Sequence, residues 1–158
     1  MKDVYVFSSS NLTNLWAGIG SGQWAVSPKQ AENKSIRTKS GKLPIGSFGI
    51  FYCVETRSIS SPFVVTSKPS LTATIRGVWD EEWQLPFLIR PLGDPRENIL
   101  VNDLPSLMPS IGPGKKRWNE VFYVTPTMVF TPSKLDEPDW EMLLLRLLPK
   151  SSIEGVAR

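Results

Sequence analysis

Short runs of β-branched and aromatic residues, separated by turn-forming residues, dominate the hydrophobic pattern of the chain. Their composition predicts strands at residues 4–7, 50–55, 63–66, 72–78 and 87–90, with a late pair at 121–124 and 128–130. Pro62 suits the start of the strand at 63–66, because proline donates no hydrogen bond within a sheet.

Helical signals are fewer, and the clearest lies at residues 138–148. Pro138 suits the first helical turn, acidic residues gather at the start, and basic residues lie near the end, which matches the helix dipole. The apolar stripe of this segment includes Trp140, so we interpret this tryptophan as a packing residue. Residues 11–16 and 103–108 favour shorter helices.

These elements together predict one α+β domain with a PUA-like curved sheet or small β-barrel flanked by a few helices. The 158 residues suit a single core, and we place the domain at residues 1–150. Residues 151–158 lack apolar periodicity and are interpreted as a linker.

Composition excludes several kinds of chemistry. Without histidine there is no Ser-His-Asp triad and no histidine-containing zinc site. No Walker sequence is present, so we expect neither an enzyme nor a cofactor. Cys53 lies in an apolar run and is expected to be buried in the core. A single cysteine forms no internal disulfide, so we expect the protein to reside in a reducing compartment. The chain has no signal-like start and no run long enough to cross a membrane, so we expect a soluble cytoplasmic protein without membrane contact.

Basic residues gather in two stretches of a nearly neutral chain. The first is a Ser/Gly/Asn/Lys-rich segment at 29–42 with little apolar patterning, interpreted as a loop, and the second is 115–117. Two such stretches indicate either a local polyanion contact or ordinary solvated loops.

Six tryptophans form the most unusual feature of the composition. Four of them, Trp16, Trp24, Trp79 and Trp83, adjoin glycine, charge or loop signals. Such rings either fold back onto the core or line a pocket for a flat ligand. Between Trp79 and Trp83 stand Asp80, Glu81 and Glu82, which are interpreted as a surface acidic turn or, as a last alternative, as carboxylates of a metal-dependent enzyme.

Several short segments resemble the YTH and EVE branch of the PUA-like superfamily. They are residues 5–14, 22–24, 49–52, 62–65, 78–79 and 87–90, within a span of about 4–95. Domains of this branch read methylated bases with an aromatic cage, and an asparagine precedes their first cage tryptophan by ten residues, a separation that Asn14 and Trp24 keep. An earlier asparagine of the YTH pattern falls on Ser10 here.

The resemblance implies a base-binding site. Trp24 and either Trp79 or Trp83 would sandwich a base, Asn14 would pair with a ring nitrogen, and the backbone carbonyl near Ala25 would accept from the exocyclic amine. The candidate phosphate contacts are basic residues in three parts of the chain: Lys42, Arg90, Lys115, Lys116 and Arg117.

The arrangement is also similar to the start of archaeal McrB-like restriction proteins, where a GTP-hydrolysing AAA+ domain follows a recognition domain. This similarity implies flipping of a modified base, above all N6-methyladenine, out of methylated duplex DNA, with a nuclease partner for the full-length protein. An RNA N6-methyladenine reader is the first alternative. A Trp-rich module that binds a peptide is an alternative of another class.

Overall fold

The structure, a computed structural model, describes residues 1–112 and 114–150. The predicted linker at 151–158 lies outside them. The strands of the domain are β1 Lys2–Ser9, β2 Gln23–Val26, β3 Phe48–Cys53, β4 Ser58–Val65, β5 Thr74–Ile75, β6 Trp83–Pro91, β7 Asn98–Leu100 and β8 Pro132–Leu135. Its helices are α1 Leu12–Ser21, α2 Pro28–Glu32, α3 Lys34–Gly41, α4 Leu104–Leu107, α5 Trp118–Val121 and α6 Glu137–Leu147, with 3-10 turns η1 Val101–Asp103, η2 Pro109–Ile111 and η3 Pro126–Met128.

The strands form one open sheet in the order β2-β6-β4-β3-β1-β8, with β5 added to β6 and β7 added to β4. β1 pairs with β3 in parallel, and the other pairs are antiparallel. The predicted α+β class is confirmed. The described strands do not close into a barrel, because the path ends at β2 on one side and at β8 on the other.

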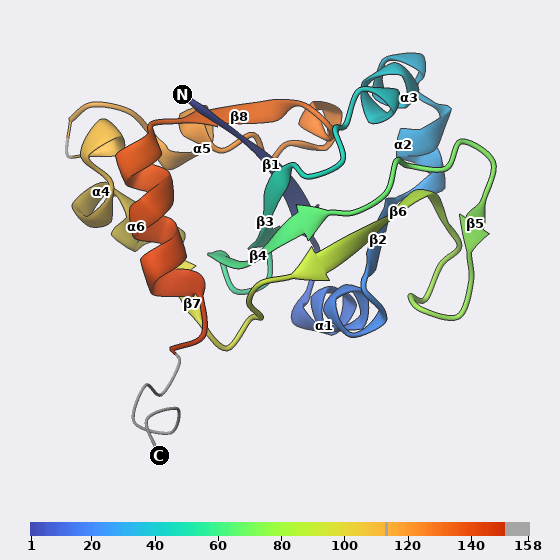
Figure 1. The fold of residues 1–158 in the computed structure, drawn as a ribbon, viewed down its shortest axis with the longest axis horizontal. Coiled ribbons are helices and arrows are strands. Elements are labelled where there is room, and N and C mark those ends of the chain that lie inside the picture. Colours follow the sequence, from blue (N-terminus) through green and yellow to red (C-terminus); the bar gives the residue numbers. More distant parts are fainter. Residues whose placement is uncertain (113, 151–158) are drawn as a thin grey trace.

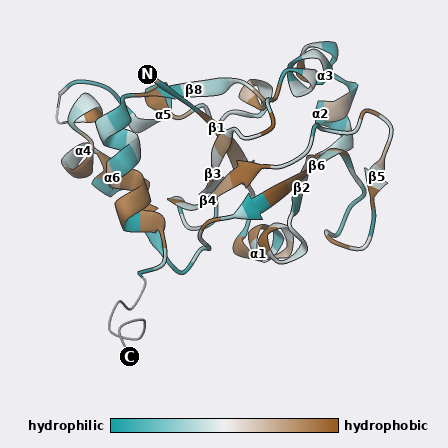
Figure 2. Ribbon diagram, in the orientation of Figure 1, coloured by the Kyte–Doolittle hydropathy of each residue, from teal (hydrophilic) through white to brown (hydrophobic). Residues whose placement is uncertain are grey.

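Two hydrophobic cores lie on the two faces of this sheet. Along β1, Tyr5 and Phe7 belong to the first core, whereas Val4 and Val6 belong to the second, as the two-residue period of a strand requires. Helices α1, α2 and α3 lie on the first side, and α4, α5 and α6 lie on the second (Figure 1). Hydrophobic residues concentrate along the strands between the two groups of helices (Figure 2). No helix of the described residues has both the length and the apolar character of a bilayer span.

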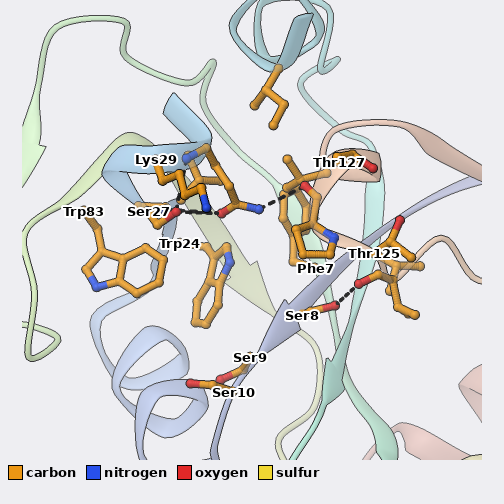
Figure 3. A pocket seen from close by; sticks show the side chains of 18 of the residues that line it. Phe7, Ser8, Ser9, Ser10, Trp24, Ser27, Lys29, Trp83, Thr125 and Thr127 are labelled. Carbon is orange, nitrogen blue, oxygen red and sulfur yellow. Dashed lines mark hydrogen bonds between the residues drawn. The ribbon is translucent and has the colours of Figure 1, made fainter. Parts of the chain in front are cut away.

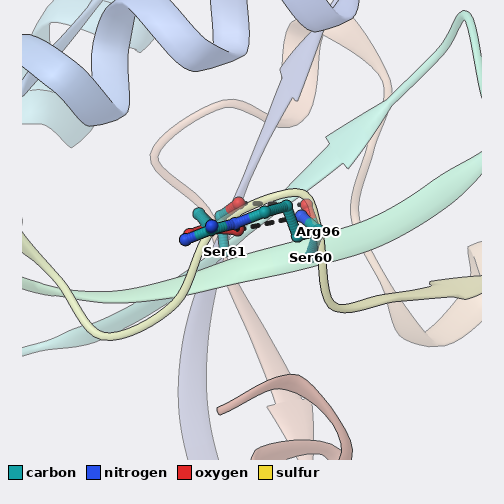
Figure 4. Close-up of polar contacts among 4 residues, drawn as sticks. Ser60, Ser61 and Arg96 are labelled. Carbon is teal, nitrogen blue, oxygen red and sulfur yellow. Dashed lines mark hydrogen bonds and ion pairs between the residues drawn. The ribbon is translucent and has the colours of Figure 1, made fainter. Parts of the chain in front are cut away.

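Two prolines occupy bulges inside strands of the sheet. Ser61 and Leu85 adopt left-handed backbone conformations with φ of 58° and 53°, and each is followed by proline. The register of β4 against β3, and of β6 against β2, shifts at these points. A bulge tolerates a residue that donates no ladder hydrogen bond. Pro62 therefore lies within β4, and its predicted place at a strand start is wrong. The hydroxyls of Ser60 and the bulged Ser61 share a hydrogen bond of 3.0 Å, and Arg96 forms an ion pair with Asp94 in the segment between β6 and β7 (Figure 4).

The predicted loop at 29–42 is wrong, because most of this segment is helical. Ser27 caps α2 in a reciprocal pair with Gln30, and the Asn33 side chain accepts from the Ile36 N–H at 3.2 Å to start α3. One buried apolar residue in each helix, such as Ile36, is sufficient to fix them on the core. These two helices are marked by their side-chain caps and lack the apolar stripe by which a helix is usually predicted from sequence.

The late strand pair at 121–124 and 128–130 is also wrong. The first segment overlaps the end of α5 and the second overlaps η3, and the strand that follows them is β8. A short apolar run does not distinguish a strand from a buried helical turn by periodicity. The segment at 72–78 forms only the two-residue β5. The predicted final helix is confirmed as α6, and Trp140 and Cys53 are buried as expected.

Candidate functional site

A cavity of about 510 Å³ opens on the face of the sheet that carries α1, α2 and α3. Its size is that of a small-molecule site. The walls come from the end of β1, the start of α1, β2, α2, α3, Trp79 and the first residue of β6, and the segment 123–129. All six predicted base-binding residues line it: Ser10, Asn14, Trp24, Ala25, Trp79 and Trp83. Figure 3 shows Trp24 and Trp83 at one end of the cavity, with Ser8, Ser9 and Ser10 on its floor.

Trp24 belongs to the core and to the cavity wall at once. Only 4 % of its surface is exposed, and its ring packs edge-on against Phe51 at 4.7 Å and against Trp79 at 5.3 Å between centroids. Gly18 of α1 lies against its other side. The two interpretations of this tryptophan, packing and ligand binding, therefore both apply. A ring held on several sides is a rigid wall for a flat ligand.

Trp79 and Trp83 have different surroundings. Trp79 is buried, and its indole N–H donates to the Asn14 carbonyl at 2.9 Å. Trp83 is partly exposed, lies 5.8 Å from Trp79 between ring centroids, and its buried indole N–H has no partner within the part of the chain that the structure describes. Trp79 is thus fixed by packing and a hydrogen bond, whereas Trp83 is fixed by packing alone.

The polar groups of the cavity come from the β1–α1 junction and from β2. Asn11 caps α1 by accepting from the Asn14 N–H at 2.7 Å, which places Asn14 in the first helical turn. No residue among 1–112 and 114–150 forms a hydrogen bond with the Asn14 side-chain amide. The Ser10 hydroxyl accepts a long hydrogen bond of 3.4 Å from Asn11. Ala25 has no register partner, because the β2–β6 ladder is irregular there. An amide and a hydroxyl are therefore available to a ligand.

The segment 123–129 forms a wall that sequence analysis missed. Side chains from three other elements hold its carbonyl groups: Ser8 donates to Val124 at 2.8 Å, Gln30 to Pro126 at 3.1 Å, and Lys39 to Thr127 at 2.9 Å. The exposed residues Thr125 and Thr127 lie across the cavity from Lys29 and Trp83 (Figure 3). Only the Ser-x-x-Gln cap at 27–30 signalled that Gln30 would be fixed in place.

The five predicted phosphate contacts are exposed, but none of them lines the cavity. Arg90 alternates with the core residue Ile89 along β6, so it lies on the other face of that strand. Lys115, Lys116 and Arg117 precede α5, which packs into the second core. Lys42 follows α3. A phosphate role for these residues stays a prediction.

Structural comparison places the fold among YTH domains. The YTH domain of the Zygosaccharomyces rouxii MRB1 protein, in complex with N6-methyladenosine RNA, aligns with a TM-score of 0.58 and 14 % identity over 96 % of this chain and 91 % of its own. The Toxoplasma CPSF4 YTH domain in its apo form aligns with a TM-score of 0.59 and 13 % identity over 97 % of this chain and 91 % of its own. The Mmi1 YTH domain aligns with a TM-score of 0.57 and 11 % identity over 99 % of this chain and 100 % of its own.

At these identities the likeness establishes the fold. The sequence itself matches no protein-family profile and no curated protein. The YTH part of the resemblance is thus confirmed at the level of the fold. The McrB-like context stays a prediction.

Proposed function

We propose that this domain binds nucleic acid that contains N6-methyladenine and holds the methylated base in the tryptophan-lined cavity. The observation that carries the proposal is the convergence of Asn14, Trp24 and Trp83 on one cavity, although Trp83 lies far from the other two in the sequence. A neighbour with the same fold is known in complex with N6-methyladenosine RNA, which supports the same ligand class here.

The tryptophans supply the apolar part of the recognition. Stacking of one base on an aromatic side chain contributes about 1–3 kcal/mol. Burial of the methyl group adds about 0.8 kcal/mol, a factor of about four in affinity. An unmethylated amine that lost its hydration against these rings without a new partner would cost about 1–3 kcal/mol. The preference for the methylated base therefore arises chiefly from the amine that the cavity leaves unpaired.

The asparagine supplies the polar part. The Asn14 amide both donates and accepts, so it can pair with a ring nitrogen of the purine in a fixed orientation. Its side chain is not used to hold the fold, whereas its backbone N–H and carbonyl are. The Ala25 carbonyl, at the irregular point of the β2–β6 ladder, is our candidate acceptor for the remaining N–H of the methylated amine.

The comparisons support RNA as the polymer, and the cost of unstacking a base favours a single strand. A base enters such a cavity only after it leaves its stack, which costs a few kcal/mol in a duplex and less in a single strand. The neighbour with N6-methyladenosine carries it in RNA. Methylated duplex DNA, and the targeting of a restriction complex with a nuclease partner, are the expectations from sequence, and the same experiment tests the polymer.

The test is a binding panel. RNA and DNA strands of one sequence, single and duplex, would each carry one N6-methyladenine, one 5-methylcytosine or neither, and affinity would be measured at two salt concentrations. We expect the tightest binding for the N6-methyladenine strands. Equal affinity for all three versions of every strand would overturn the proposal. Binding that did not depend on salt would favour the peptide module instead.

The metal-dependent alternative finds no support in the geometry. Among residues 1–112 and 114–150, no three His, Cys, Asp or Glu side chains gather as a metal site. Glu82 of the acidic turn instead pairs with Arg76 at 2.9 Å.

Substitution of Asn14 by alanine should weaken binding of the methylated strand about 2- to 13-fold, because one hydrogen bond contributes about 0.5–1.5 kcal/mol. The thermal midpoint should change little, since the backbone contacts of this residue survive the change. Asn119→Ala, at an exposed position of α5, is the matched control and should change neither quantity. Unchanged affinity in Asn14→Ala would remove this residue from the site.

A further inference from the structure

Two segments of opposite charge lie at the cavity. Asp80, Glu81 and Glu82 are exposed and lie in the sequence between Trp79 and Trp83, which both line the cavity. Lys29 of α2 is exposed and lines the cavity itself. A polyanion that enters the cavity meets these two segments with opposite electrostatic energies.

Two basic residues of α3, Arg37 and Lys39, are already used by the fold. The Lys39 ammonium donates to the Thr127 carbonyl at 2.9 Å and to the Thr131 hydroxyl at 2.8 Å. The Arg37 guanidinium donates to the Leu71 carbonyl at 2.8 Å. These two side chains stabilise loops and are not free to follow a ligand.

Lys29 differs from them. Within the described ranges of the chain its ammonium forms neither a hydrogen bond nor an ion pair, and it is the basic residue that lines the cavity. The exposed residues across the cavity from it, Thr125 and Thr127, carry no charge (Figure 3). A phosphate at the cavity mouth near α2 would therefore meet the Lys29 cation without a competing carboxylate from segment 123–129.

The acidic segment stays negative. Arg76 neutralises Glu82 across 2.9 Å, while Asp80 and Glu81 have no ion-pair partner in residues 1–112 and 114–150. A phosphate at the 80–82 loop would face two uncompensated carboxylates.

We propose that the nucleic-acid backbone passes the cavity mouth along α2, with a phosphate next to the bound nucleotide on Lys29, and that Asp80 and Glu81 repel phosphates from the 80–82 loop. This inference rests on the proposed function and adds the path of the strand to it. It assigns phosphate recognition at the cavity to a residue outside the five candidates named from the sequence.

The expected magnitudes are those of exposed charges. A single-stranded ligand that loses one phosphate contact should show a salt slope smaller by about 0.7. Exposed pairs contribute about 0.2–1 kcal/mol, so the affinity should fall about 1.4- to 5-fold. Because a phosphate contact does not involve the base, methylated and unmethylated strands should lose the same factor.

The test measures affinity for a methylated and an unmethylated single strand at several salt concentrations. It compares the unsubstituted chain with Lys29→Gln, Lys42→Gln and the double variant Asp80→Asn/Glu81→Gln. We expect Lys29→Gln to weaken both strands equally and to flatten the slope, and Lys42→Gln to have a smaller effect. The acid variant should bind both strands more tightly at low salt, and the gain should vanish at high salt.

The outcomes separate the two proposals. Absence of any preference for the methylated strand in the unsubstituted chain would overturn the proposed function. If the unsubstituted chain prefers the methylated strand, two results would overturn the path proposed here. One is an unchanged salt slope of the affinity in Lys29→Gln, and the other is a loss of affinity in Lys42→Gln that equals or exceeds the loss in Lys29→Gln. Weaker binding by the acid variant would overturn it as well.

Discussion

Replacement of Trp24 by alanine is expected to abolish the preference for the methylated base and to lower the free energy of unfolding by about 3–5 kcal/mol. Both effects follow from one position. The ring is 4 % exposed, packs on Phe51 and Trp79, and still forms a wall of the cavity. Urea denaturation would give the loss of stability, and the methylated-to-unmethylated affinity ratio would give the loss of recognition.

This coupling requires two companion variants. Trp16→Ala removes a tryptophan that is 41 % exposed on α1, and it should leave stability and recognition nearly unchanged. Trp83→Ala removes the partly exposed ring beside Trp24, and it should reduce affinity for the methylated strand by about 1–3 kcal/mol with a smaller loss of stability. Full stability in Trp24→Ala, or an intact affinity ratio in a folded Trp83→Ala, would contradict the double role assigned to the cavity wall.

The part of the site that sequence could predict is the part fixed by local spacing. Asn14 and Trp24 lie on successive elements, α1 and β2, with one tight turn at Gly22 between them. A fixed separation along such a short path determines a fixed separation in space. The strands β1 and β3 were predicted from their aromatic and β-branched residues, which the structure buries on both faces of the sheet.

The wall at 123–129 could not be predicted, because nothing in its own pattern determines its place. It is held by Ser8, Gln30 and Lys39, which lie about a hundred residues away in sequence. The same wall shows why the sequence alone does not reveal which basic residues of 29–42 are available to a ligand. The Lys39 ammonium donates to the Thr127 carbonyl and the Thr131 hydroxyl of that region.

Gly18→Ala should destabilise the domain by about 1–3 kcal/mol and weaken binding of the methylated strand. A Cβ at this position would lie 2.5 Å from Cε3 and 2.7 Å from Cζ3 of Trp24. The Trp24 ring cannot move away from this Cβ, because Phe51 and Trp79 pack against the ring at 4.7 and 5.3 Å between centroids. The added methyl group must therefore shift either α1 or the ring that lines the cavity.

Gly20→Ala is the matched control on the same helix. A Cβ there meets nothing within 4 Å, so the change should stabilise α1 by about 0.5–1 kcal/mol through helix propensity alone. Denaturant unfolding and affinity for the methylated strand would be measured on both variants. Opposite signs of the stability change, with binding weakened only in Gly18→Ala, would show that the close approach of α1 to Trp24 sets the shape of the cavity. Equal stabilisation by both alanines would show that the ring yields without cost, and the cavity wall would then not be rigid.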